Sequence, residues 1–143
     1  MRRTLRSVRR DDYLEFLSTL GPFTACSPTE LRTIARASTL VARESGNVLV
    51  RRGASVREFF VLASGSAVII RDGLPDVAMR PGDWFGDVDL LSKSAASATV
   101  IALTDVELVV MSYPEFSALF DGVRSFRRRL VRALATSSAR RPA

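Results

Sequence analysis

The chain has 143 residues, of which 47% are hydrophobic and 25% charged, so it is long enough to fold as one domain with its own core. One cysteine and no histidine exclude an intramolecular disulfide and remove the usual zinc ligand and general base. The net charge of +6 is uneven, because residues 1–10 carry five Arg, residues 124–143 carry seven, and neither segment holds an acid. Residues 11–123 hold 9 basic and 15 acidic residues, a net charge of −6. We therefore expect an acidic body with two basic ends.

No apolar run follows the arginines of the first ten residues, so a secretory signal is not expected. No run approaches the roughly 20 apolar residues that cross a bilayer. The sequence predicts a cytoplasmic protein with a basic tail at 1–10, one domain at 11–137 and a second tail at 138–143.

Two helices are predicted at the start of the domain. The apolar residues of 11–20 recur at the i, i+3, i+4, i+7 spacing of an amphipathic helix: Tyr13, Phe16, Leu17 and Leu20. Gly21-Pro22 ends this helix. The segment 27–30 reads Ser-Pro-Thr-Glu, a capping box with proline at the first helical position. It predicts a second helix that runs through about Ala37.

Between Ser38 and Met111 the pattern becomes strand-like. Short β-branched segments alternate with glycines, and the strand cores are expected at 48–50, 59–62, 67–70, 77–79, 98–103 and 107–111. Arg-Asp-Gly at 71–73 is a hairpin turn signal. This spacing of short strands favours an antiparallel sandwich or barrel.

Two further helices are predicted at the end. A second capping box, Ser-Tyr-Pro-Glu at 112–115, opens a helix through about Phe120. A last helix begins near Val123, with arginines on its outer faces. Its expected apolar stripe is Val123, Phe126, Leu130 and Leu134.

The most informative segment lies between these strands. Residues 85–91 read Phe-Gly-Asp-Val-Asp-Leu-Leu, and residues 97–100 read Ser-Ala-Thr-Val. This pairing resembles the phosphate-binding cassette of cyclic-nucleotide-binding domains, the sensor module of catabolite-activator-type regulators. Cassettes of that family typically read Phe-Gly-Glu, two or three apolar residues, a short loop, then Pro-Arg-Ser/Ala-Ala/Thr. Ala95 and Ala96 stand at the Pro and Arg positions, and Asp87 stands where Glu is usual.

Other stretches resemble the same family in the same order, at 44–49, 51–53, 59–67 and 102–108. The resemblance covers roughly residues 14–135. It implies an α+β, mainly β fold: an antiparallel β-roll or jelly roll with an N-terminal helical pair, a short internal cassette helix and C-terminal closing helices.

The resemblance also implies a ligand site. Its cassette residues are Phe85, Gly86, Asp87, Val88, Ala96, Ser97 and Ala98. In the family, backbone amides and an arginine hold the cyclic phosphate, and the glutamate accepts a hydrogen bond from the ribose 2′-hydroxyl. Ala96 offers no donor beyond its own N–H, and Asp87 is one methylene shorter than glutamate. Loss of an Arg–phosphate contact costs about 2–5 kcal/mol, or roughly 30- to several-thousandfold in affinity.

Structural roles compete with these ligand roles. Asp87 fits the first turn of a short helix, Gly86 a tight turn, and Ser97 an ordinary strand. Phe126 and Leu130 form either a lid over the ligand's base or part of the core. Lys93 lies three residues before Ala96 and is a candidate substitute cation for the phosphate.

Our leading hypothesis is a stand-alone, non-enzymatic regulatory module with weak or lost affinity for cyclic AMP. It has no catalytic residue, no metal and no cofactor, and it acts on a protein partner or a second copy through the C-terminal helices. Three alternatives stay open: a working cyclic nucleotide sensor that uses backbone amides and Lys93, a sensor of a neutral or cationic molecule, and an electrostatic adaptor whose Arg-rich ends bind nucleic acid or membrane. Sequence-specific DNA binding is not expected because no recognition helix is available, and membrane binding is not favoured.

Overall fold

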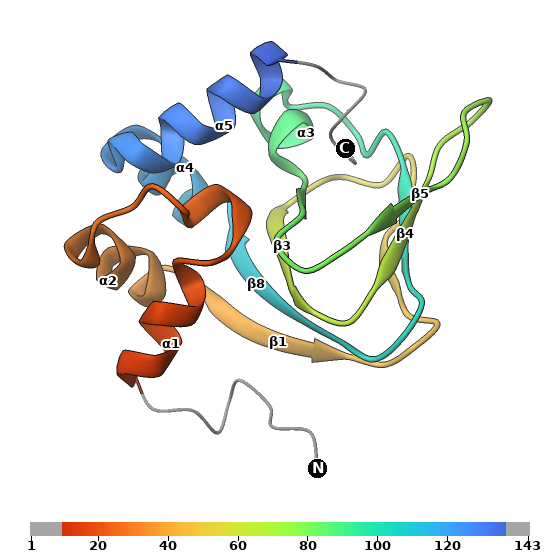
Figure 1. Cartoon of the computed structure of the whole chain (residues 1–143). Helices are drawn as coiled ribbons and strands as arrows, with labels where there is room; N and C mark the ends of the chain where they lie inside the picture. The colour runs from red at the N-terminus through yellow and green to blue at the C-terminus, as the bar shows by residue number, and fades with distance from the viewer. Residues whose placement is uncertain (1–9, 137–143) are drawn as a thin grey trace.

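The computed structural model describes residues 10–136, so nearly all of the tails expected at 1–10 and 138–143 lies outside the described part of the chain. The helical elements are α1 (Arg10–Leu17), the 3-10 turn η2 (Gly21–Phe23), α2 (Pro28–Arg36), α3 (Asp87–Ser92), α4 (Tyr113–Gly122) and α5 (Arg124–Thr136). The strands are β1 (Thr39–Arg43), β2 (Val48–Val50), β3 (Glu58–Ser64), β4 (Ala67–Ile70), β5 (Val77–Met79), β6 (Trp84–Phe85), β7 (Thr99–Ala102) and β8 (Val106–Ser112). Helices α1, α2, α4 and α5 gather on one side of the β-roll, as Figure 1 shows.

The strands form two four-stranded antiparallel sheets. One sheet has the order β1-β8-β3-β6 and the other has the order β2-β7-β4-β5. β4 joins β5 by the hairpin predicted at 71–73, where Gly73 adopts a φ of +69°. This arrangement confirms the predicted mainly β roll with helices before, within and after it.

β3 is buried on both faces, and its side chains alternate between two cores because successive residues of a strand point to opposite sides. Phe59 and Val61 pack with the helices, in a cluster that also contains Phe23. Phe60 and Leu62 point into the roll interior and pack with residues of the second sheet. β3 is therefore the wall shared by the helical layer and the roll.

Both capping boxes predicted from the sequence are present. In α2 the Glu30 N–H donates to Ser27 Oγ at 3.2 Å, and the Ser27 N–H donates to Glu30 Oε1 at 2.8 Å. In α4 the Glu115 N–H donates to Ser112 Oγ at 3.3 Å, and the Ser112 N–H donates to Glu115 Oε1 at 2.8 Å. Each box satisfies two backbone N–H groups that a helix start otherwise leaves unpaired.

Several boundaries differ from the prediction. α1 ends at Leu17 and not near Leu20, because the Leu20 N–H bonds back to the Leu17 carbonyl in a tighter turn. The short elements η2, β1 and β6 were not foreseen. On α5 the apolar stripe passes from Leu130 to Ala133, which is buried, and Leu134 is 41% exposed. The buried face of α5 continues three residues after Leu130, at Ala133, and not four residues after it, at Leu134. The prediction for Leu134 was therefore wrong.

Candidate functional site

β6 and α3 together place the cassette against the wall strand β3. Phe85 pairs with Phe60 of β3, and the two rings stack with centroids 4.7 Å apart. Gly86, the N-cap of α3, follows with a φ of +101°, a backbone conformation that residues with a Cβ atom rarely adopt. A Cβ on Gly86 would lie 2.7 Å from the Glu58 carbonyl oxygen. The turn role left open for Gly86 is thus confirmed, whereas its contact with a ligand stays a prediction.

The second half of the cassette is fastened to the β2–β3 connection. The Ala96 N–H donates to the Ala54 carbonyl at 2.8 Å, and the Ala96 carbonyl accepts from the Gly53 N–H at 2.9 Å. Ala95 forms an isolated β-bridge with Ser55. Ala96 is 4% exposed. The single donor that Ala96 possesses is therefore engaged within the fold.

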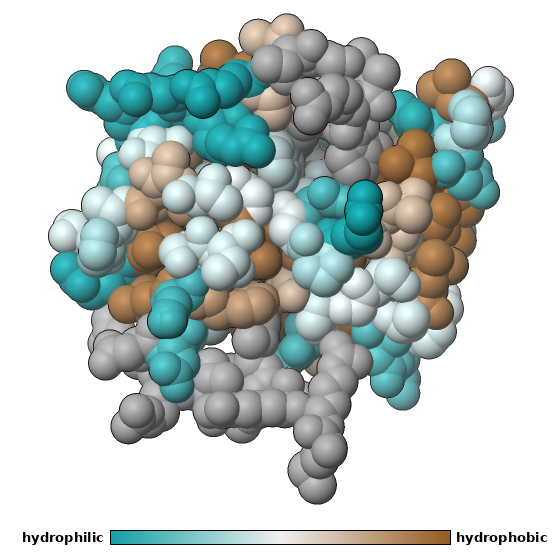
Figure 2. Space-filling view, in the orientation of Figure 1, coloured by the Kyte–Doolittle hydropathy of each residue, from teal (hydrophilic) through white to brown (hydrophobic). Residues whose placement is uncertain are grey.

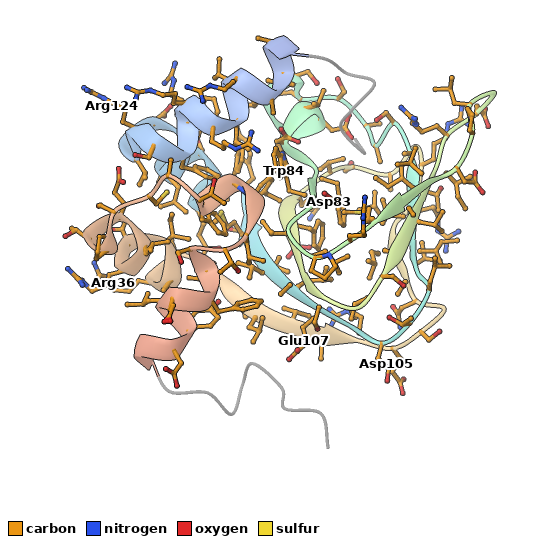
Figure 3. The ribbon with its side chains drawn as sticks, viewed as in Figure 1. Arg36, Asp83, Trp84, Asp105, Glu107 and Arg124 are labelled. Carbon is orange, nitrogen blue, oxygen red and sulfur yellow. The ribbon has the colours of Figure 1, made fainter. Side chains whose placement is uncertain are left out.

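Asp87 points into the protein. Its side chain is fully buried, and Oδ2 accepts a hydrogen bond from Trp84 Nε1 at 3.3 Å. Trp84 lies between α5 and the β-roll (Figure 3), with the Arg129 guanidinium 5.3 Å from its ring centroid. The same indole packs against Gly21, where a Cβ would lie 2.6 Å from it. Trp84 thus links the cassette to both helical segments, a role that sequence reasoning missed.

Asp89 lies in the first turn of α3, and its carboxylate reaches Ser97 in the second half of the cassette. Oδ2 is 3.4 Å from both the Ser97 N–H nitrogen and Ser97 Oγ, and both groups donate to it. Burial raises the pKa of Asp89 above its usual range, and the Ser97 donors oppose that rise. Ser97 lies before β7 and not in a strand, so the strand role expected for it was wrong. Its two donors bind a carboxylate of its own chain, and its contact with a phosphate stays a prediction.

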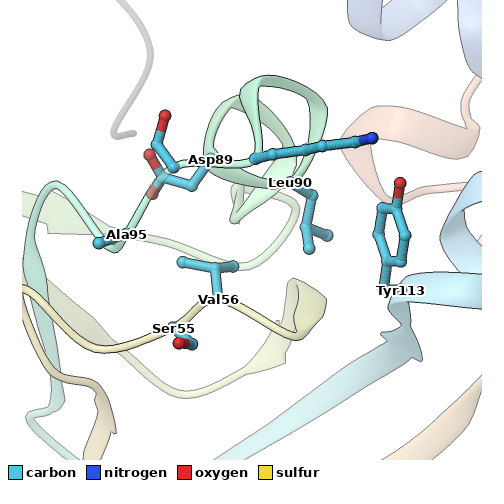
Figure 4. A pocket seen from close by; sticks show the side chains of 8 residues that line it. Ser55, Val56, Asp89, Leu90, Ala95 and Tyr113 are labelled. Carbon is cyan, nitrogen blue, oxygen red and sulfur yellow. The ribbon is translucent and has the colours of Figure 1, made fainter.

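A pocket of about 340 Å³ opens beside α3. Asp89, Leu90 and Lys93 line it from the cassette, and Ser55, Val56 and Tyr113 line its other walls (Figure 4). Lys93 caps α3 in the left-handed conformation, with a φ of +56°. The predicted substitute cation thus borders the same pocket as Asp89.

The remaining predicted site residues do not share this pocket. Phe85 and Ala98 belong to the core of the roll, and Val88 is exposed on α3. Phe126 and Leu130 are fully buried in the helical core. The Phe126 ring lies 5.8 Å from the ring of Phe23, 5.8 Å from that of Phe59 and 5.9 Å from that of Phe116. Their packing role is therefore clear, and the lid role stays untested.

The outer face of α5 is basic. Its exposed arginines are Arg124, Arg127, Arg128 and Arg132. Arg127 also contacts the Asp121 carboxylate at 3.8 Å and lies 5.0 Å from the Phe120 ring centroid. Hydrophilic side chains cover this part of the molecule in Figure 2.

Two classes of site can be assessed within the part of the chain that the structure describes. No group of three or more cysteine, aspartate or glutamate side chains gathers there in a geometry that could hold a metal ion. No helix between residues 10 and 136 has the length and apolar content to cross a bilayer.

Comparisons with known proteins agree with this architecture. The family model of the cyclic nucleotide-binding domain matches residues 40–122. The cAMP-dependent protein kinase regulatory subunit of Aspergillus fumigatus is 30% identical over 123 residues, covering 85% of this chain and 30% of that protein. The corresponding subunit of Aspergillus niger is 28% identical over 123 residues, with the same coverage. The chain thus spans about a third of the length of these curated relatives.

Solved structures share the fold. The regulatory domain of Toxoplasma gondii PKA with cAMP has a TM-score of 0.76 and 24% identity, over 90% of this chain and 51% of that one. Thermus thermophilus catabolite activator protein has a TM-score of 0.72 and 22% identity, over 80% of this chain and 56% of that one. The regulatory subunit of a cAMP-independent protein kinase A from Trypanosoma brucei has a TM-score of 0.73 and 23% identity, over 87% and 47%. With the family model matching more than half of its length, this chain belongs to the cyclic nucleotide-binding domain family.

Proposed function

We propose that the chain is a non-enzymatic regulatory module whose affinity for cyclic nucleotides is weak or lost. The observation that carries this proposal is Ala96, which stands at the arginine position of the cassette and is buried, with its N–H donating to Ala54. A cyclic phosphate would find neither a guanidinium nor an available N–H at this residue. Charge-assisted contacts of this kind are among the strongest that bind phosphate.

The orientation of Asp87 supports the same conclusion. Its carboxylate is fully buried and accepts from Trp84 inside the protein, so this side chain would have to turn outward to make the contact with a ribose hydroxyl that is usual at this position. The fold is also found in a regulatory subunit described as belonging to a cAMP-independent protein kinase A. We expect a module that works in the cytoplasm without a cofactor or metal.

A titration tests this function directly. The protein is titrated calorimetrically with cyclic AMP and with cyclic GMP, beside a nucleotide-binding regulatory domain as positive control. A relative with micromolar affinity would become roughly millimolar after a loss of about 4 kcal/mol. We therefore expect no saturation at micromolar nucleotide. Low-micromolar binding would refute the proposal and favour a working sensor in which Lys93, at the pocket wall, replaces the arginine.

The basic face of α5 supports a second, compatible role in binding a partner protein with an acidic surface. The exposed arginines of this helix are not offset by acidic residues within the helix itself. In this family of folds a shift of the closing helices is a natural output, because α5 packs on the wall strand β3, which also pairs with β6 of the cassette. Reversal of two charges, Arg128→Glu and Arg132→Glu, should abolish partner capture, whereas Arg80→Glu in the β5–β6 turn should not.

A further inference from the structure

Asp89 places a negative charge within the ligand cassette. The resembled cassette has apolar residues after its Phe-Gly-Glu, whereas here an aspartate occupies the middle of the apolar run. Its Oδ2 accepts from the Ser97 N–H and from Ser97 Oγ, each at 3.4 Å. The carboxylate therefore bridges the two halves of the cassette, the helix α3 and the segment that leads into β7.

The backbone holds this carboxylate in position. The Asp89 carbonyl accepts from the Ser94 N–H at 2.9 Å, and this bond closes the turn after α3. The segment beyond that turn is fixed by the two backbone hydrogen bonds between Ala96 and the residues 53 and 54. Asp89 and Ser97 are thus presented to each other by two segments that backbone hydrogen bonds anchor.

The backbone N–H and the side-chain O–H of Ser97 are donors suited to a phosphate oxygen. In this structure a carboxylate uses both of them. A ligand phosphate at Ser97 would have to displace Asp89 and would then lie beside its negative charge. Asp89 also borders the 340 Å³ pocket beside α3, so its carboxylate lies next to open space as well as next to Ser97.

We propose that Asp89 is a specificity-determining residue that occupies the Ser97 donors and excludes anionic ligands from the cassette. The pocket beside it, which Lys93 also borders, then offers this carboxylate to a neutral ligand that presents a hydrogen-bond donor. This inference rests on the proposed function and deepens it, because it names a second obstacle to cyclic nucleotides that is independent of Ala96.

The test compares aspartate variants in a background where nucleotide binding is measurable. In an Ala96→Arg protein, Asp89→Asn removes the charge and keeps an acceptor of the same shape, whereas Asp89→Ala removes both. Asp76→Asn, in the exposed β4–β5 connection, is the matched control for loss of one negative charge. Cyclic AMP is the probe, and its affinity is measured calorimetrically.

We expect Asp89→Asn to tighten cyclic AMP binding by about tenfold, as befits one charge-assisted interaction, and Asp89→Ala to tighten it at least as much. The Asp76→Asn control should stay within a factor of about two. Equal affinity of the Asp89 variants and their Ala96→Arg background would overturn the inference. Tight binding by the unmodified protein would instead refute the proposed function, so the two failures are distinguishable.

A second measurement needs no nucleotide. The Ser97 amide proton should change its NMR chemical shift as Asp89 titrates, and this step should vanish in Asp89→Asn. A Ser97 amide that does not respond to acid in the unmodified protein would show that the carboxylate does not occupy these donors.

Discussion

Replacement of Phe126 by alanine separates the two roles that the sequence leaves open for this residue. Phe126 is fully buried, and its ring lies within 6 Å of the rings of Phe23, Phe59 and Phe116, centroid to centroid. Such a substitution removes the buried apolar surface and leaves a cavity, which together cost about 3–5 kcal/mol. Because three ring contacts are lost at once, we expect the upper half of this range.

The change in the free energy of unfolding can be measured by urea denaturation. Trp84 is the single tryptophan of the chain and lies in the helical core, so its fluorescence reports the transition. Leu134→Ala, on the same helix but 41% exposed, is the control and should cost less than about 1 kcal/mol. A Phe126→Ala protein as stable as the control would refute the core assignment. If it also lost affinity for a ligand, Phe126 would be a lid.

Three further predictions follow from single residues. Gly86→Ala should destabilise the fold by about 2–4 kcal/mol in urea unfolding, because the φ of Gly86 is +101° and the new Cβ would lie 2.7 Å from the Glu58 carbonyl oxygen. The control, Gly46→Ala, has a φ of +88° and no atom within 4 Å of the new Cβ, so it should cost less. Equal costs in free energy of unfolding would contradict the steric argument. Burial and the nearby Glu30 carboxylate raise the pKa of Cys26 to about 11, so alkylation by iodoacetamide at pH 8 should run roughly a hundredfold slower than for an ordinary thiol; reaction at the ordinary rate would exclude this environment. Burial raises the pKa of Asp89, so its ionisation destabilises the folded state as the pH rises from about 4 through the raised value. Asp89→Asn should therefore raise the free energy of unfolding more at pH 7 than at pH 4. A difference in free energy between variant and unmodified protein that does not change with pH would contradict this.

Much of the architecture could be predicted because its signals are local. The two capping boxes begin helices where the sequence places them, and the cores of β2, β4 and β5 match the predicted segments. Each signal depends on neighbouring residues alone: a side chain that caps the next turn, or β-branched residues between glycines. β1 and β6 lack such signals, since no side chain of β1 is fully buried and β6 has two residues held by pairing with β3.

The sequence located the candidate cassette, but it did not predict the contacts that the cassette side chains make. The cassette sequence located Gly86 and Ala96, and it showed that alanine stands at the position where the resembled family has arginine. The hydrogen bond from Trp84 to Asp87 and the one from Ser97 to Asp89 depend on how the β6–α3 turn orients two acids of similar character. The Asp87 carboxylate turns into the core, whereas the Asp89 carboxylate reaches Ser97 in the segment that leads into β7. The two residues are two positions apart, so helical spacing places them on different sides of α3, but it does not predict which partner each carboxylate meets.

We propose that Ala96 leaves the cassette without the cation that binds a cyclic phosphate. A calorimetric titration with cyclic AMP, of the unmodified protein and of Ala96→Arg, tests it most directly, with thermal unfolding as a check that the buried position accepts the larger side chain. We expect no saturation of the unmodified protein at micromolar nucleotide and an affinity at least about 30-fold higher in the variant. Low-micromolar binding by the unmodified protein, with no gain in the variant, would contradict it.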